Sequence, residues 1–404
     1  MTDALTASRY RHREADASIL VLDADGQPLR DQDITVAQVR HAFGFGCTAP
    51  GAPGLEQEWL DVFDTATLAF YWGRYEPEPG RPDVAALTRR ARALAEHGVR
   101  LKGHPLVWHT VKAPWVDRLP LDEAERALRG RIRREVGDFA GLIDSWDIVN
   151  EAVIMPRFEN EPDGVRNAIT RLCEQYGQVE FIRMAVDEAR SVNPDAALVL
   201  NDFDLGPKYE RLIEQVLDAG VRIDAIGLQS HMHKGYRGEE YVHEVCERFS
   251  RFGLPLHWTE TSLLSGDLMP KHIVDLNDHV VDEWPSTPEG EARQADEIVR
   301  HYRTLVEHPA VAAVTYWGFD DATAWLNAPS GLVRRDGSPK PAYDALRDLV
   351  RGEWWYGAVD ARTDADGRVA LRAFAGDFEI SAHEGRAVVS VGAGDSSVRA
   401  VLNG

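Results

Sequence analysis

The fold is decided by RLKGHPLVWH at residues 100–109 and by its successors along the chain, DSWDIVNEA (144–152), ALVLNDFD (197–204) and DAIGLQSHMH (224–233). Each contains a short apolar run and has polar residues near its end, which is typical of a strand buried on both faces. Segments of helical period lie between such runs, for example LDEAERALRGRIRREVGDFAGLI (121–143) and QVEFIRMAVDEARSV (178–192). The alternation predicts βα units around a parallel sheet.

Four further strands extend this pattern in both directions, namely HAFGFGC (41–47), TATLAFYW (65–72), PLHWTETSLL (255–264) and AVTYWGFDD (313–321). Eight strands separated by helices favour a (β/α)8 TIM barrel over an open doubly wound sheet. The sequence contains neither a G-x-G-x-x-G motif nor a phosphate-binding P-loop. We therefore expect no nucleotide cofactor.

The two ends of the chain have the period of two that is typical of antiparallel strands. After PKPAYDALRDLVRGEWW (339–355), the runs GRVALRAFAG, DFEISAHEG and RAVVSVGAG follow without a helical pattern. Short strands also surround the turn DGQPL near the N-terminus. We predict an N-terminal β segment over 1–40, a barrel over 41–352, and a C-terminal β module over 353–404 that the N-terminal strands join.

Composition excludes several classes of partner. The 404 residues include 45 Lys and Arg against 66 Asp and Glu, a formal charge of −21, which argues against nucleic acids and anionic membranes. Three widely spaced cysteines form neither a disulfide framework nor a close-set zinc site. With no signal-peptide pattern visible, we expect a cytoplasmic location; the oligomeric state is not predicted.

Polar and aromatic side chains gather at the carboxyl ends of the predicted strands, where the active site of such a barrel lies. They are His104, Trp108, His109, Asn150, Glu151, Asn201, Asp202, Gln229, His231, His233, Glu260, Trp317, Asp320, Asp321 and Trp325. Aromatic faces stack on the C–H faces of sugar rings, and amide, imidazole and carboxylate groups hydrogen-bond hydroxyls. The set predicts a carbohydrate site.

Glu151 and Glu260 are the candidate catalytic pair. Each follows an apolar run, WDIVN or PLHWT, where burial should raise the pKa of a carboxyl group. Glycosidic cleavage needs one protonated and one ionised carboxyl, and His231 could hydrogen-bond the ionised Glu260. On spacing alone, ordinary strand-end glutamates paired with Arg or Lys are an equal alternative.

A metal centre is not expected. His109, His233 and His257 could suggest one, but neutral histidines bonded to carboxylates or sugars are the commoner arrangement. We therefore predict a site without metal or other cofactor.

Six strings, in chain order, resemble the signature segments of glycoside hydrolase family 10, the xylanase family. They are GHPLVWH, WDIVNEA, LNDFD, IDAIGLQSHMH, WTETSLL and TYWGFDDATAWL, and the resemblance covers roughly residues 41–351. It implies a (β/α)8 barrel with endo-1,4-β-xylanase-like activity and retaining hydrolysis by double displacement. Glu151 matches the family's acid/base and Glu260 its nucleophile.

The resemblance also implies how the substrate is held. His104, Asn150 and Gln229 match residues that bind the sugar at the cleavage point, and His231 matches the partner of the nucleophile. Trp317 and Trp325 match the aromatic walls. We add Trp108, Tyr71 and Trp72 to the expected substrate-binding residues.

One segment departs from the family. Its members usually carry Glu-Asn-x-x-Lys-Trp at the end of the second strand, where this chain has TLAFYWGRYEPEPG (67–80). If Trp72 takes the tryptophan's place, Thr67, Leu68 and Tyr71 replace the Glu, Asn and Lys that bind the non-reducing-side sugars. We expect apolar stacking there instead, at Phe70, Tyr71 and Trp72.

The predicted function is therefore a retaining, xylanase-like β-glycoside hydrolase acting on short soluble substrates. The altered second strand favours an alternative, an exo-acting hydrolase of a small or decorated β-glycoside. A non-catalytic sugar-binding protein is a rival from another class, although such a protein needs neither an acid nor a nucleophile. The substrate partner is an oligosaccharide or small glycoside in either enzymatic case.

Overall fold

A closed barrel of eight parallel strands forms most of the computed structural model, which describes residues 9–51, 54–159, 166–383 and 385–403. This architecture confirms the predicted (β/α)8 TIM barrel. The strands follow the order β10-β3-β4-β5-β6-β7-β8-β9 around the barrel, so that β4 and β8 lie opposite each other. They are β3 (Gly44–Thr48), β4 (Thr65–Ala69), β5 (Arg100–His104), β6 (Ser145–Asn150), β7 (Ala197–Asp202), β8 (Ala225–Leu228), β9 (Leu256–Thr261) and β10 (Val311–Tyr316).

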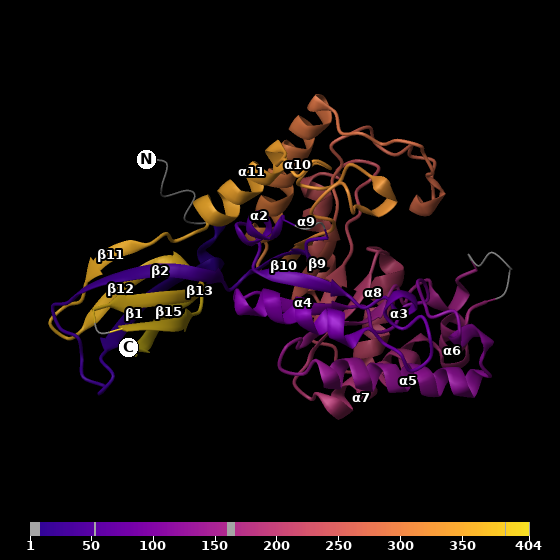
Figure 1. Ribbon diagram of the computed structural model, residues 1–404, viewed down its shortest axis with the longest axis horizontal. Coiled ribbons are helices and arrows are strands. Elements are labelled where there is room, and N and C mark those ends of the chain that lie inside the picture. The colour runs from indigo at the N-terminus through magenta and orange to yellow at the C-terminus, as the bar shows by residue number, and fades with distance from the viewer. Residues whose placement is uncertain (1–8, 52–53, 160–165, 384, 404) are drawn as a thin grey trace.

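Helices follow the strands and surround the barrel (Figure 1). Several begin at a side chain that accepts a hydrogen bond from the first turn, as Asp83, Asn167 and Thr287 do. None in the described part of the chain is long and apolar enough to cross a membrane. The helices are α2 (Glu56–Leu60), α3 (Trp72–Tyr75), α4 (Val84–Glu96), α5 (Leu121–Asp138), α6 (Ala168–Tyr176), α7 (Gln178–Val192), α8 (Pro207–Asp218), α9 (Glu239–Ser250), α10 (Pro288–Glu307) and α11 (Pro341–Asp348).

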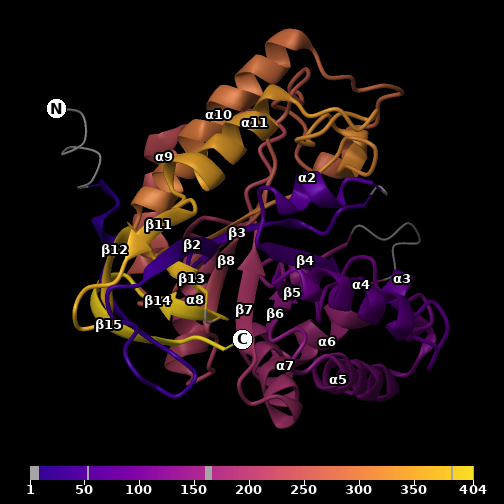
Figure 2. The same cartoon turned by 60° about the vertical axis from the view of Figure 1, so that its left-hand side comes forward.

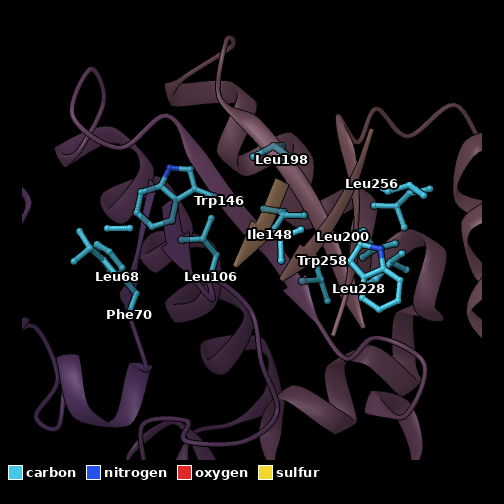
Figure 3. Close-up of a cluster of buried hydrophobic side chains, with 14 of the residues drawn as sticks. Leu68, Phe70, Leu106, Trp146, Ile148, Leu198, Leu200, Leu228, Leu256 and Trp258 are labelled. Carbon is cyan, nitrogen blue, oxygen red and sulfur yellow. The ribbon is translucent and has the colours of Figure 1, made fainter. Parts of the chain in front are cut away.

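The barrel strands are apolar because both of their faces are covered. Figure 3 shows part of this core, in which Trp146 and Trp258 pack among leucines of several strands. Gly103 in β5 makes room for the first of these rings, because a Cβ atom there would lie 2.1 Å from Trp146. The large side chains therefore fix how neighbouring strands approach one another.

A β-sandwich built from both ends of the chain accompanies the barrel, in agreement with the predicted accessory module. Figures 1 and 2 show its indigo N-terminal strands lying among yellow C-terminal strands. One sheet has the order β12-β1-β15 and the other β11-β2-β13-β14. The strands are β1 (Glu14–Leu22), β2 (Asp33–His41), β11 (Val359–Arg362), β12 (Arg368–Phe374), β13 (Gly376–Ala382), β14 (Gly385–Val391) and β15 (Gly394–Val401).

Alternating side chains of the two sheets form a core separate from that of the barrel, including Ile19, Val36, Leu371, Phe378 and Ile380. This alternation explains why the two ends of the sequence have a period of two. The boundaries 1–40, 41–352 and 353–404 stay predictions.

Arg13 connects the module to the barrel. The residue lies just before β1, and its guanidinium donates to the backbone carbonyls of Val306 (3.1 Å), His308 (2.7 Å) and Val311 (2.5 Å) between α10 and β10. It also lies 4.8 Å from the ring centroid of Phe43. One cation thus links the end of α10 to the start of β10.

Replacing Arg13 with Met should lower the thermal unfolding midpoint measured by calorimetry. Hydrogen bonds that involve a charged group contribute ~1.5 to 3 kcal/mol each, and the carbonyls would stay partly buried. Arg11→Met is the matched control, because the Arg11 side chain is 50% exposed and forms only long ion pairs, at 3.7 Å to Glu14 and 3.6 Å to Asp395. Equal effects of the two substitutions would contradict the anchoring role.

Candidate active site

A cleft of about 1550 Å³ opens at the carboxyl ends of the barrel strands. It brings together the predicted catalytic and substrate-binding residues except Phe70 and Trp72, whereas the other strand-end candidates Asn201, Asp202, His233, Asp320 and Asp321 do not line it. Those lining it are Tyr71, His104, Trp108, Asn150, Glu151, Gln229, His231, Glu260, Trp317 and Trp325. Residues from distant parts of the sequence meet here because parallel strands end at one rim.

Glu260, on β9, has the surroundings of an ionised carboxylate. The Nε2 of His231 donates to its Oε2 at 2.8 Å, and the Nδ2 of Asn201 donates to its Oε1 at 2.8 Å. Burial by itself would raise the pKa of Glu260, but the bond from His231 and the electrostatic influence of His104 and His231 hold that pKa below its usual value. Glu260 is therefore charged at neutral pH.

Glu151 follows β6 and has the opposite character. Burial, reinforced by the negative charges of Glu260 and Asp202, raises its pKa to about 8, although the Nε1 of Trp108 donates to its Oε2 at 2.8 Å. Its backbone has a φ of 59°, in the left-handed region that a non-glycine residue rarely occupies. Such strain persists where surrounding structure enforces it, and it is common at functional sites.

A chain of amides joins the two carboxyl groups. The Nδ2 of Asn201 donates both to Glu260 and to the Oδ1 of Asn150 (2.8 Å), while the Nδ2 of Asn150 donates to Glu151 at 3.3 Å. Thr259 donates to the Oδ1 of Asn201 at 2.6 Å, which fixes the orientation of that amide. The glutamates are thus held relative to each other without a direct contact.

The sequence places Asn201 among the polar residues at the strand ends, where it follows the buried run ALVL much as Asn150 follows DIV, but it does not connect Asn201 with Glu260. Thr259 is not among the predicted site residues. Thr259 offers no comparable signal, because a threonine in a strand is ordinary. Its contribution depends on the neighbouring strand.

His104 is held by a buried ion pair that the sequence analysis also missed. Its Nδ1 lies 2.7 Å from the Oδ2 of Asp147, to which the ammonium of Lys102 approaches within 2.9 Å. Burial opposes ionisation of Asp147, but Lys102 and His104 keep its pKa below the usual value. Charged residues inside the apolar strands RLKGH and SWDIV were the available signal.

Aromatic rings form the walls of the cleft. Trp317 lies edge-on to His104, with ring centroids 5.0 Å apart, and the ring of Trp325 is 5.0 Å from that of His231. Trp108 packs against Tyr71 at 5.6 Å, and both rings also lie near His104. Flat faces and hydrogen-bonding groups thus alternate around the mouth, as sugar recognition requires.

The second-strand segment differs from the expectation that three aromatic residues face the substrate. Tyr71 lines the cleft, but Phe70 is fully buried and Trp72 is only 5% exposed. Trp72 instead donates its Nε1 to Glu76 at 2.9 Å, because it is the first residue of α3 and Glu76 follows one turn later. Arg74 enters the cleft from the same segment and lies over the Tyr71 ring at 5.4 Å.

Of the histidines considered for a metal, His109 and His233 are buried, and their ring nitrogens have no hydrogen-bond partner among the described residues. Burial lowers the pKa of His109 and His233 to about 3 and that of His257 to about 4, so all three are neutral. A different group of potential ligands, His243, Glu247 and His308, lies near the start of β10, at the other end of the barrel. There the Nε2 of His308 already bonds Glu247 at 3.0 Å.

A (β/α)8 barrel whose cleft holds one protonated and one ionised carboxyl group among aromatic walls defines a glycoside hydrolase, an enzyme that cleaves O-glycosyl bonds. Comparison with known sequences identifies the family of glycoside hydrolases. Residues 65–349 match Glycosyl hydrolase family 10. The chain belongs to this family and is xylanase-like, as its motifs predicted.

Relatives and solved structures agree with this assignment. Endo-1,4-beta-xylanase B of Thermotoga neapolitana is 26% identical over 297 residues, 69% of this chain and 78% of that protein. Anti-sigma-I factor RsgI6 of Acetivibrio thermocellus is 23% identical over 384 residues, 91% of this chain but 45% of that protein. The structure of native xylanase 10B from Thermotoga maritima aligns with a TM-score of 0.61 at 22% identity, covering 77% of this chain and 96% of that chain, and supports the fold.

The dependence of kcat/KM on pH should have two limbs. If Glu260 is the nucleophile predicted from the sequence, activity should rise through the lowered pKa of Glu260, below 4.5. If Glu151 is the acid, activity should fall as pH passes about 8. A kcat/KM profile on a glycoside with a poor leaving group measures both limbs, and an alkaline limb near pH 5 would contradict the raised pKa of Glu151.

Proposed function

We propose that the protein is a retaining β-glycoside hydrolase in which Glu260 is the nucleophile and Glu151 the acid/base. The observation that carries this proposal is the opposite displacement of two pKa values within one cleft. A nucleophile must be ionised and an acid must be protonated at the same pH. A protein that only binds sugars has no use for this difference.

In the first step, a carboxylate oxygen of Glu260 attacks the anomeric carbon while Glu151 gives its proton to the departing glycosidic oxygen. The leaving group departs with that proton, and a covalent glycosyl-enzyme ester remains. In the second step, the Glu151 carboxylate takes a proton from water, and the resulting hydroxide equivalent displaces Glu260 from the anomeric carbon. Glu151 is protonated again and Glu260 is ionised again.

The residues around the two glutamates have different roles in this mechanism. His231 stabilises the charge on Glu260 before attack, and Asn201 orients the same carboxylate. Asn150 and Gln229 lie between the two carboxyl groups, where amides can bind the hydroxyls of the reacting sugar. His104, Trp108, Tyr71, Trp317 and Trp325 complete the proposed substrate contacts.

We further propose that the substrates are short and soluble. The family's Glu, Asn and Lys that hold sugars on the non-reducing side are replaced here by Thr67, Leu68 and Tyr71. Thr67 is 4% and Leu68 1% exposed, so neither offers a polar atom equivalent to those it replaces. Tyr71 and Arg74 supply an aromatic and positively charged wall, which favours the alternative of an exo-acting hydrolase of a small or decorated glycoside.

Substitution of the two glutamates tests their roles. Glu260→Ala should abolish turnover of every glycoside, because the nucleophile is lost. Glu151→Ala should retain activity on dinitrophenyl glycosides, whose leaving group departs without a proton, and lose it on alkyl glycosides and oligosaccharides. The measurement is kcat/KM on a series of leaving groups.

Matched controls are Glu151→Gln and Glu260→Gln, which keep the volume and many of the hydrogen bonds. An equal loss on good and poor leaving groups in Glu151→Ala would show that the acid is elsewhere. Full activity in Glu260→Ala, or no hydrolysis of any glycoside by the natural protein, would favour a different mechanism or a sugar-binding role.

A second prediction concerns xylan. Hydrogen bonds to charged groups contribute ~1.5 to 3 kcal/mol each, so loss of several such contacts should lower kcat/KM on polymeric xylan. We expect a small β-glycoside or short oligosaccharide to be the better substrate. Comparison of kcat/KM on xylan, xylo-oligosaccharides and a panel of aryl glycosides tests this, and xylan activity of ~10⁴ M⁻¹s⁻¹ or more, with no panel member superior, would contradict it.

A further inference from the structure

The cleft carries an excess of positive charge although the protein is strongly acidic. Its lining contains six basic residues, Arg74, Arg90, Lys112, Arg157, Lys234 and Arg237, and four acidic ones, Glu151, Glu159, Glu260 and Asp275. With Glu151 protonated, the lining has a net charge of about +3, against −21 for the whole chain. A local reversal of this kind attracts anions into a cleft.

Most basic residues of this protein are neutralised by carboxylates, but some in the cleft are not. In the described parts of the chain, Arg74, Arg157, Lys234 and Arg237 have no carboxylate within ion-pair distance. The ammonium of Lys234 bonds instead to the backbone carbonyl of Ile273. Arg237 bonds the hydroxyl of Tyr241 and lies 5.0 Å from its ring centroid. These neutral contacts orient the two cations without cancelling their charge.

Lys234 and Arg237 come from the loop between β8 and α9, and both line the cleft. Because β8 lies opposite β4 in the barrel, this loop lies across the mouth from Tyr71 and Arg74. The β4 side is where the proposed function places the non-reducing part of the substrate. The β8 side then receives the part that leaves with the proton of Glu151.

We propose that Lys234 and Arg237 select substrates whose leaving part carries a carboxylate, such as a sugar with an acidic substituent or an aromatic acid. This inference rests on the proposed hydrolase function and specifies its substrate class. The flat ring of Tyr241 beside Arg237 offers a surface for the same part of the ligand. Asp275 also lines the cleft, and its negative charge is included in the net charge of about +3, because the hydrogen bonds that it accepts from Asn277 are neutral.

A matched pair of chromogenic substrates tests the proposal. One is the β-xylobioside of a carboxylated nitrophenol and the other is that of the corresponding neutral carboxamide, which has nearly the same shape. At 0.01 M ionic strength, kcat/KM should be about tenfold or more higher for the carboxylate. The ratio should approach one at 1 M, where the Debye length is only ~3 Å.

In the double variant Lys234→Met/Arg237→Gln, the ratio of kcat/KM for the carboxylate to that for the carboxamide at low salt should be close to one. The control Arg30→Gln/Arg222→Gln also removes two positive charges, but both residues are exposed and lie outside the cleft, on a turn of the sandwich and before β8. It should keep the preference. The ratio of two substrates on one variant does not depend on how much of the protein is folded.

The outcomes separate the two proposals. The inference is overturned if the carboxylate-to-carboxamide ratio of kcat/KM in the natural protein is one or below at low salt. It is also overturned if the preference for the carboxylate survives in Lys234→Met/Arg237→Gln. In either case, hydrolysis of the carboxamide still supports the proposed function. If neither glycoside is hydrolysed, the proposed function fails for these substrates. Binding of the same two glycosides is then measured by calorimetry. The inference requires the natural protein to bind the carboxylate at least several-fold more tightly than the carboxamide. The variant Lys234→Met/Arg237→Gln should bind the two equally.

Discussion

The active site depends on keeping two buried carboxyl groups in different protonation states. Both Glu151 and Glu260 are removed from water, and burial alone would raise both pKa values. Glu260 has the hydrogen bonds from His231 and Asn201 that stabilise its charge. That charge in turn helps to keep Glu151 protonated. The difference between two chemically identical side chains is therefore a property of the partners on neighbouring strands.

The raised pKa of Glu151 lowers the free energy of unfolding of the protein. A carboxyl group with a raised pKa in the folded state ionises more readily in the unfolded chain, so Glu151 reduces the free energy of unfolding as pH rises from 4.5 towards 8. The left-handed backbone at Glu151 adds strain. The closed barrel and its large aromatic core, with Trp146 and Trp258 fully enclosed, offset these costs.

The part of the cleft expected to bind the non-reducing sugars departs from the family motifs, whereas the part around the two glutamates keeps them. The catalytic region, built from the ends of β6, β7, β8 and β9, matches the family motifs. The β4 segment does not contain the Glu-Asn-x-x-Lys-Trp motif, and its Trp72 is buried and donates to Glu76. On a TIM barrel, loops can change in this way because the strands, not the loops, form the core.

The sequence alone determined the barrel and its eight strands, because apolar runs that end in polar residues are local patterns. The same pattern made Glu151 and Glu260 candidates, and the resemblance to family motifs gave them their expected roles. The sequence also indicated a second β unit at both ends of the chain. Only the tertiary structure decided which C-terminal strands pair with β1 and β2, and that Asn201, oriented by Thr259, bonds both Glu260 and Asn150. It also decided that Phe70 and Trp72 are buried outside the cleft lining. These features depend on contacts between side chains of different strands. The residues in contact are far apart in the sequence, and packing of the folded chain decides which of them meet.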